Sequence, residues 1–183
     1  VGLIPAGGGC KEMLIRANER AASGEELDLG HALKEVFEQM ALGKVATSAE
    51  EAKAFGYLRP TDRVSMNAER LIADAKQTAI ELDEAGWRTP APPEIKVLGQ
   101  SALSLMKLAA HIMKRAGYAT DHDAVVAGKL AHVLAGGPLS APQTVSEQYV
   151  LDLEREAFLS LCGERKTLER IQFTLKTGKP LRN

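Results

Sequence analysis

The sequence predicts an all-α fold, and three observations lead to this class. Apolar residues recur at helical spacing through most of the 183 residues, capping residues and glycines mark the ends of these segments, and the alternation typical of strands is nearly absent. The composition, with 45% hydrophobic and 26% charged residues, is that of an ordinary globular protein. We expect eight helices, with short extended pieces at Arg63–Met66 and Ile95–Leu98.

The first two helices are expected after a glycine-rich turn, Gly7-Gly8-Gly9. The first spans about Gly9–Ala22 and the second about Leu29–Ala41, with the polar link Ser23-Gly24-Glu25-Glu26 between them. The second helix has apolar residues at the spacing i, i+3, i+4 and i+7, which predicts one face turned toward a core. This stripe consists of Ala32, Leu33, Val36, Phe37 and Met40.

Capping residues mark the third and fourth helices. Ser48, with Glu51 three residues later, has the pattern of a capping box, and Gly56 ends this short helix. Asn67 is expected to cap the fourth helix, which Gly86 ends. The inward-facing residues of the fourth helix are expected to be Leu71, Ile72, Ala75, Ala79 and Leu82.

A proline-rich stretch, Trp87–Pro93, interrupts the helical pattern, because proline lacks an N–H and restricts the residue before it. The stretch is either a linker between domains or a crossing on the surface of one domain. We expect three parts: residues 1–86, a linker at 87–99 and a helical region at 100–183.

Four helices are expected in the last part. Thr120 caps one of them, with Asp121 and Asp123 in its first turn, where the helix dipole favours negative charge. Thr144 and Glu147 have capping-box spacing at the start of the next helix. The four expected spans are about Gln100–Ala116, Thr120–Ala135, Thr144–Leu161 and Arg165–Lys176.

Composition and charge exclude several classes of function. The formal net charge of −1 leaves no basic excess for binding nucleic acid. No apolar run approaches the roughly 20 residues of a membrane span, and no signal peptide is visible, so a cytoplasmic location is expected. Cys10 and Cys162 are expected to be free thiols, with a disulfide between them as the less favoured alternative.

No pattern predicts a metal centre or an activated nucleophile. Asp121-His122-Asp123 fits helix capping better than a ligand cluster. The basic residues near the end of the chain, Lys176, Lys179 and Arg182, either meet a phosphate or favour the C-terminus of a helix. The four histidines fall on different expected helices: His31, His111, His122 and His132. A solvated carboxylate face is expected at Glu147, Asp152, Glu154 and Glu156, with Glu154 nearest the apolar stripe.

The glycine turn has two open interpretations. It exposes backbone N–H groups at a helix N-terminus, where amides without intrahelical partners and the helix dipole attract anions or polarised oxygens. It is not a phosphate-binding loop of the Walker type, because Cys10 and Glu12 stand where Gly-Lys-Ser/Thr would be needed. It also lacks the Gly-x-Gly-x-x-Gly spacing of a dinucleotide site. The alternative is the plain start of a helix.

A resemblance to known proteins extends over nearly the whole chain. Gly2–Gly9 resembles the stretch that leads out of the second catalytic region of the crotonase (enoyl-CoA hydratase/isomerase) superfamily, and Met40–Leu58 is similar to a later segment of that family. Three further stretches resemble the C-terminal end of bacterial fatty-acid β-oxidation proteins: Leu58–Asn67, Tyr149–Phe158 and Glu169–Asn183. Those proteins join a 3-hydroxyacyl-CoA dehydrogenase to an enoyl-CoA hydratase region.

The resemblance implies that this chain holds no catalytic residue. The oxyanion-hole amides and the first glutamate of the hydratase lie far upstream in the family, and the second glutamate falls just before Val1. What remains is a substrate-binding segment, expected at Ile4, Pro5, Ala6, Gly7 and Gly8. The amide after the proline helps to hold the catalytic water in the family; that position is usually glycine and is Ala6 here. The substrate implied is an acyl-CoA, with NAD bound in the dehydrogenase part and no metal.

Two functions remain open. The first is a piece of a β-oxidation enzyme that supplies the wall of the acyl-CoA pocket and contacts between subunits of a homo-oligomer, inactive by itself. The second is a non-catalytic helical assembly module. A glutamate just before Val1 favours the hydratase. The Gln100–Gly137 helices have no counterpart in simple hydratases, and apolar stripes without a partner predict association of the isolated chain.

Overall fold

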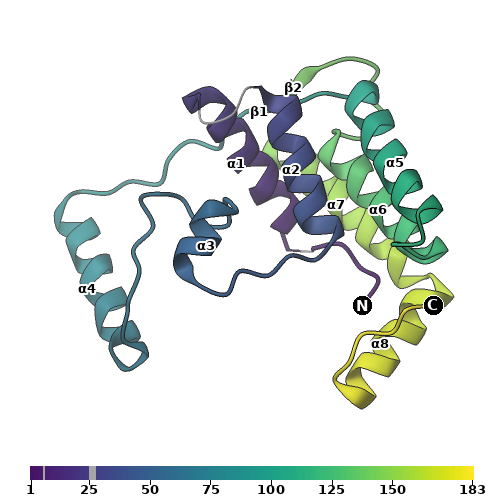
Figure 1. Ribbon diagram of the computed structural model, residues 1–183. Coiled ribbons are helices and arrows are strands. Elements are labelled where there is room, and N and C mark those ends of the chain that lie inside the picture. The colour runs from purple at the N-terminus through teal and green to yellow at the C-terminus, as the bar shows by residue number, and fades with distance from the viewer. Residues whose placement is uncertain (6, 25–27) are drawn as a thin grey trace. The chain divides into compact units, whose positions relative to one another are not determined.

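The predicted all-α class is confirmed. The computed structural model describes residues 1–5, 7–24 and 28–183, and within these ranges it contains eight α-helices, one 3-10 helix and one two-stranded ribbon (Figure 1). The chain divides into two compact units: Val1–Lys44 together with Pro93–Asn183, and Val45–Pro92. The larger unit is therefore built from two separated stretches of sequence.

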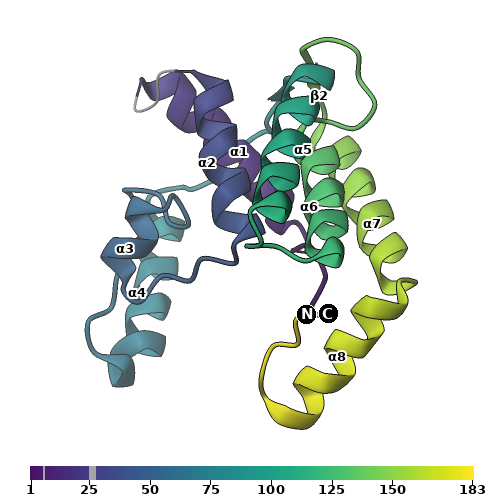
Figure 2. The same cartoon turned by 45° about the vertical axis from the view of Figure 1, so that its right-hand side comes forward.

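The larger unit is a helical bundle in which α6 is central, because it packs against α1, α2, α5 and α7. These helices lie side by side in both ribbon views (Figures 1 and 2). The fully enclosed side chains include Leu14, Leu33 and Leu134. The helices of this unit are α1 (Gly9–Ser23), α2 (Leu29–Ala41), α5 (Gln100–Arg115), α6 (Asp121–Leu134), α7 (Glu147–Cys162) and α8 (Arg165–Thr177).

A short antiparallel ribbon closes one end of this bundle. It joins β1 (Ile95–Val97) to β2 (Gln143–Val145), with Ile95 opposite Val145. The side chain of Asn18, on α1, donates to the Lys96 carbonyl at 3.1 Å and accepts from the Lys96 N–H at 3.0 Å, as a further strand would. The extended piece expected at Ile95–Leu98 is thus confirmed, whereas Arg63–Met66 forms no strand.

The smaller unit contains α3 (Ala49–Ala54), the 3-10 helix η1 (Ala68–Arg70) and α4 (Leu71–Glu84). No residue of α4 is buried: Leu71 is 57% and Ile72 84% exposed, and the prediction that the stripe from Leu71 to Leu82 faces inward is wrong. A helical stripe predicts an apolar face but not its partner. Within this unit the chain supplies only a two-turn helix and one 3-10 turn to cover it.

The expected caps lie close to their predicted positions, with small shifts. Ser48 caps α3 by accepting from the Glu51 N–H at 3.1 Å, but the Glu51 carboxylate bonds Thr47 instead of Ser48. Asn67 caps η1, which leads into α4, rather than α4 itself. These shifts of one to three residues reflect the several acceptors that compete for the free N–H groups at a helix start.

Two helix starts in the larger unit show one confirmed cap and one wrong assignment. Thr120 and Asp123 form a complete capping box, with bonds of 3.1 Å to the Asp123 N–H and 2.8 Å from the Thr120 N–H. Thr144 lies in β2, and Ser146 caps α7 by accepting from the Tyr149 N–H at 3.2 Å. Thr144 is part of the β-ribbon, and the capping pattern alone does not predict a strand at this position.

Candidate functional site

The described residues of the predicted substrate-binding segment are irregular and lead into α1. Ile4 is buried, Pro5 and Gly7 are exposed and Gly8 is buried; Ala6 lies outside the described residues. Gly7 and Gly8 have φ values of 72° and 96°, in the left-handed region that favours glycine. At Gly9, an added Cβ would lie 2.6 Å from the Pro5 Cβ, so the close approach of the chain to itself also requires glycine.

A buried carboxylate occupies the amides of this turn. Glu154, on α7, is 2% exposed, and its two oxygens accept from the Gly8 N–H at 2.7 Å and the Lys11 N–H at 3.1 Å. An anion in this position is stabilised by unpaired amides and by the dipole of α1. The prediction that Glu154 lies on a solvated face is wrong, although its nearness to the apolar stripe of its helix was the correct signal.

The sequence contains a clear sign of this burial in retrospect. Val150, Glu154, Ala157 and Leu161 are the buried residues of α7, and they follow one another at intervals of helical spacing. A carboxylate inside such a stripe needs donors opposite it, because an unpaired buried charge costs several kcal/mol, about 3 or more. Gly8 of the glycine turn, 146 positions away, and Lys11 of α1, 143 positions away, supply them.

Lys11 forms a charged bridge beside the turn. Its ammonium lies 2.6 Å from a Glu12 oxygen and 2.7 Å from a Glu147 oxygen, so α1 and α7 are joined a second time. Burial alone lowers the pKa of Lys11, but the hydrogen bonds to Glu12 and Glu147 outweigh that effect and raise it. Lys11 is therefore a cation at neutral pH, committed to these two carboxylates.

Cys10 lies at the same helix start but is not an activated thiol. Its side chain is fully buried, and Sγ lies 3.4 Å from the Pro5 carbonyl oxygen. Burial, and next the nearby charge of Glu154, raise the pKa of the Cys10 thiol far above its ordinary value. The thiolate required of a nucleophile is thus absent at neutral pH. Both cysteines are free, which confirms that prediction.

A small hollow of about 220 Å³ adjoins the turn. Of the predicted site residues that the structure describes, Gly7 and Gly8 line it, and Ile4 and Pro5 do not. At this hollow the Glu154 carboxylate faces the turn. The hollow is therefore lined by a charged side chain and by the backbone of the turn. The remaining lining is Gln148, Leu151, Arg155 and Phe158, all from α7.

A second buried polar cluster holds the other end of the segment. The Thr167 hydroxyl, on α8, donates to the Gly2 carbonyl at 2.9 Å, and His122 Nε2 lies 2.8 Å from the same hydroxyl oxygen. Because the hydroxyl proton goes to Gly2, the His122 Nε2–H donates to Thr167. Gly2 has φ 79°, and an added Cβ would lie 3.1–3.2 Å from the Arg170, Thr167 and His122 side chains.

Arg170 completes this cluster. Its side chain is 7% exposed, and its guanidinium bonds Asp123 at 2.7 Å, Thr120 at 3.1 Å and Asn183 at 2.8 Å. Gly2 and Asn183 are thus both held against α8 (Figure 2). Sequence reasoning assigned no role to Thr167 or Arg170: Thr167 belongs to no motif, and Arg170 lies in the Glu169–Asn183 stretch, which carried only the family resemblance.

The Asp121-His122-Asp123 stretch acts in capping and packing. Asp123 completes the capping box, Asp121 pairs with Lys114 at 2.7 Å, and His122 is buried. Burial, and next the charge of Arg170, lower the pKa of His122, which is therefore neutral at pH 7. Among the residues that the structure describes, no group of three or more His, Cys, Asp or Glu side chains has the geometry of a metal site.

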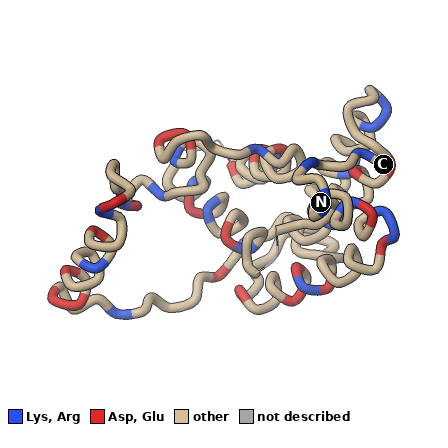
Figure 3. The backbone as a smooth tube through the Cα atoms, turned by 90° about the horizontal axis from the view of Figure 1, so that it is seen from below, with Lys and Arg blue, Asp and Glu red and all other residues tan. Residues whose placement is uncertain are grey.

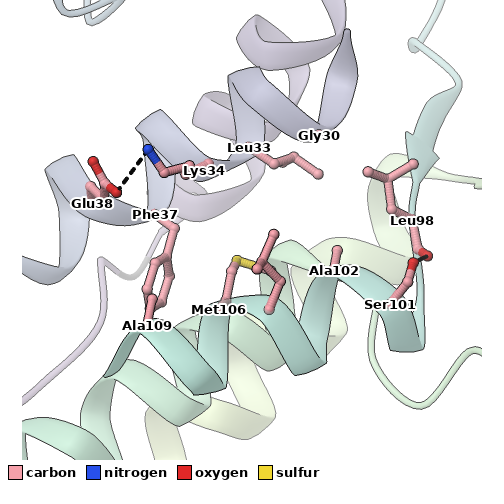
Figure 4. Close-up of a pocket in the computed structure, with 11 residues that line it drawn as sticks. Gly30, Leu33, Lys34, Phe37, Glu38, Leu98, Ser101, Ala102, Met106 and Ala109 are labelled. Carbon is pink, nitrogen blue, oxygen red and sulfur yellow. Dashed lines mark hydrogen bonds and ion pairs between the residues drawn. The ribbon is translucent and has the colours of Figure 1, made fainter. Parts of the chain in front are cut away.

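Two further hollows lie between helices of the larger unit. Figure 4 shows one of about 230 Å³ between α2 and α5, walled by Leu33, Phe37 and Met106, with the Lys34–Glu38 ion pair at its edge. A second, of about 620 Å³, extends over α2, α5 and α6, with Arg182 at its rim bonded to the Tyr118 carbonyl at 2.7 Å. Both linings suit apolar groups.

Charged residues of both signs are mixed along the chain. Acidic and basic positions are interspersed along the backbone, in keeping with 23 basic and 24 acidic residues (Figure 3). None of the described helices combines the length and the apolar character needed to cross a membrane.

Comparison with known proteins finds one informative likeness. The chain is 45% identical, over all 183 residues, to a protein of Bacillus subtilis (strain 168) named probable 3-hydroxyacyl-CoA dehydrogenase. The chain spans 23% of the length of that relative. No protein-family model matches the chain, and no solved structure matches it. The likeness thus concerns one part of a considerably longer protein.

Proposed function

We propose that this chain is the helical C-terminal part of a longer fatty-acid β-oxidation enzyme, a 3-hydroxyacyl-CoA dehydrogenase joined to a crotonase-like enoyl-CoA hydratase region. The observation that carries the proposal is the 45% identity, along the whole chain, to a relative named for the dehydrogenase. The hydratase region rests on the resemblance of Gly2–Gly9 to the crotonase superfamily. In this enzyme the chain supplies part of the acyl-CoA site and contacts within a homo-oligomer.

The segment from Ile4 to Gly8 is the proposed wall of the acyl-CoA site. The Glu154 carboxylate accepts a hydrogen bond from the Gly8 N–H, and the exposed Gly7 lines the hollow. In the proposed mechanism the amide of Ala6 helps to hold the water that adds to the enoyl double bond. Two glutamates and two oxyanion-hole amides, all upstream of Val1, perform acid–base catalysis and stabilise the enolate charge.

NAD belongs, in this proposal, to the dehydrogenase part outside this chain. The two described strands have three residues each and pair antiparallel, whereas the doubly wound fold that binds dinucleotides is built on parallel strands. The apolar hollows beside α2 and α5 supply surfaces of the kind that an acyl chain or a neighbouring apolar layer contacts.

The proposal is tested on the full-length protein by measuring NAD-dependent oxidation of a 3-hydroxyacyl-CoA and hydration of crotonyl-CoA. Ala6→Pro deletes the backbone N–H, whereas Ala6→Gly keeps it and serves as the control. We expect Ala6→Pro to lose about 100- to 1000-fold in hydration, as for removal of one preorganised donor, with dehydrogenase activity unchanged in both variants.

Two results would contradict it. Normal hydration by Ala6→Pro means that the turn is only the start of a helix. Crotonyl-CoA hydration by the purified 183-residue chain means that the catalytic groups are not upstream of Val1, because we expect this chain to be inactive by itself.

The second candidate, a non-catalytic assembly module, is favoured by one observation. Leu105, Leu108 and Ile112 of α5 are each more than half exposed and recur at helical spacing on one face. Exposed apolar patches of several hundred Å², roughly, mark surfaces that associate. Sedimentation of the full-length protein, with both activities absent and a defined oligomer present, would select this candidate over the enzyme.

A further inference from the structure

The segment that contains the glycine turn is attached to the rest of the protein at two places, both far away in the sequence. Glu154 binds the turn at Gly8 from α7, and Thr167 binds Gly2 from α8. Both side chains are buried, at 2% and 0% exposure. The bonds therefore lie where water does not compete for the same donors and acceptors.

The first attachment determines where the turn lies along α7. A carboxylate that accepts from two amides, Gly8 N at 2.7 Å and Lys11 N at 3.1 Å, defines both the position and the orientation of the first turn of α1. The Lys11–Glu147 ion pair joins the same two helices a second time. A sliding movement of the glycine turn along α7 would break these bonds together.

The second attachment determines where the segment begins. The Thr167 hydroxyl donates to the Gly2 carbonyl, and His122 donates to the same hydroxyl. Two consecutive hydrogen bonds thus connect α6, through Thr167 of α8, to the backbone of Gly2. The ion pair of Arg170 and Asp123, at 2.7 Å, joins α8 to α6 beside these two hydrogen bonds. Since Gly2 has no room for a Cβ without movement of these side chains, the contact is a close one.

We propose that Glu154 and Thr167 are positioning residues for the hydratase site: through these two attachments, the helices α6 to α8 hold Gly2–Pro5 and Gly7–Gly8 at the distance from the acyl-CoA that water addition requires. This inference rests on the proposed function. It gives the C-terminal helices a role in the chemistry, without contact between their side chains and the substrate. It also explains why Glu154 fills amides that would otherwise bind an external anion.

The test uses full-length protein and two pairs of variants. Glu154→Gln keeps the volume but presents an NH₂ group to one of the two amide donors, and Glu156→Gln changes an exposed carboxylate on the same helix as its control. Thr167→Val removes the hydroxyl, and Thr167→Ser keeps it. The Thr167 pair decides the question even where Glu154→Gln does not yield folded protein.

We expect the kcat of crotonyl-CoA hydration to fall about 10- to 100-fold in Glu154→Gln and Thr167→Val, which is the size of effect that a displacement of about 1 Å has on a reacting geometry. The KM for crotonyl-CoA should change little, because the attachments hold a group that acts in the transition state. Oxidation of 3-hydroxybutyryl-CoA by the same polypeptide should be unchanged, as should hydration by Glu156→Gln and Thr167→Ser.

Three other results overturn the inference. Wild-type hydration kinetics in Glu154→Gln or Thr167→Val show that the attachments do not position the turn, while the proposed function stands. A parallel loss of hydration and oxidation shows a general structural role instead. Absence of hydration by the wild-type protein overturns the proposed function itself, and the inference with it.

Discussion

Replacing Glu154 with alanine in the 183-residue chain should lower its thermal stability markedly. The substitution removes a buried carboxylate and leaves the amides of Gly8 and Lys11 without the acceptor that they bind at 2.7 and 3.1 Å. Each unsatisfied buried donor costs about 1–3 kcal/mol. Loss of the charge at the N-terminus of α1 costs about 0.3–1 kcal/mol more.

The gain from no longer burying a charge offsets part of this cost. The two donors left without an acceptor together cost about 2–6 kcal/mol, and we take about 3 kcal/mol on balance, because one of the two bonds is only partly buried. For a chain of this length 1 kcal/mol shifts Tm by about 2–4 °C. The expected fall in Tm is therefore about 6–12 °C.

Circular dichroism at 222 nm during a thermal scan measures this shift. Glu156→Ala is the matched control, because Glu156 is exposed on the same helix and the substitution has the same effect on helix propensity. Glu154→Gln should fall between the two, since its single amide oxygen still accepts one of the two N–H groups. Equal melting temperatures for Glu154→Ala and Glu156→Ala would refute the assignment of Glu154 as the partner of the turn.

Three further predictions follow from burial and from the direction of pKa shifts. A thiol reagent at neutral pH should modify Cys162 in the folded chain and Cys10 only after unfolding, because burial raises the pKa of Cys10; prompt reaction of two thiols in the folded chain contradicts this. The pKa of His122 is lowered in the folded state, so the unfolded chain binds a proton below about pH 6.5 that the folded chain does not, and stability should decrease from about pH 7 to 5. In urea titrations, His122→Gln should make the free energy of unfolding depend less on pH. An unchanged pH dependence in this variant would contradict the prediction. Leu14→Ala should cost about 2–5 kcal/mol and Ile72→Ala less than about 0.5 kcal/mol in the isolated chain; similar costs would show that α4 is covered.

The sequence by itself determined the helices, because their signals are local. The expected span Leu29–Ala41 is that of α2, and the expected starts of α1, α5 and α8 also agree with the structure. Periodicity, capping residues and glycines act within a few neighbouring positions, so they can be recognised without knowledge of the fold. The glycine turn at the start of α1 was recognised for the same reason.

Tertiary structure alone decided which partners the helices and the turn have. The Gly8–Glu154 bond joins positions 146 apart and the Gly2–Thr167 bond positions 165 apart, and no local pattern specifies such pairs. The exposure of α4 within its unit has the same origin, because its stripe predicts an apolar face while burial depends on what the rest of that unit brings against it. A carboxylate within an apolar stripe thus indicates that a partner exists, but only the packing of α7 against α1 shows that the partner is a pair of backbone amides.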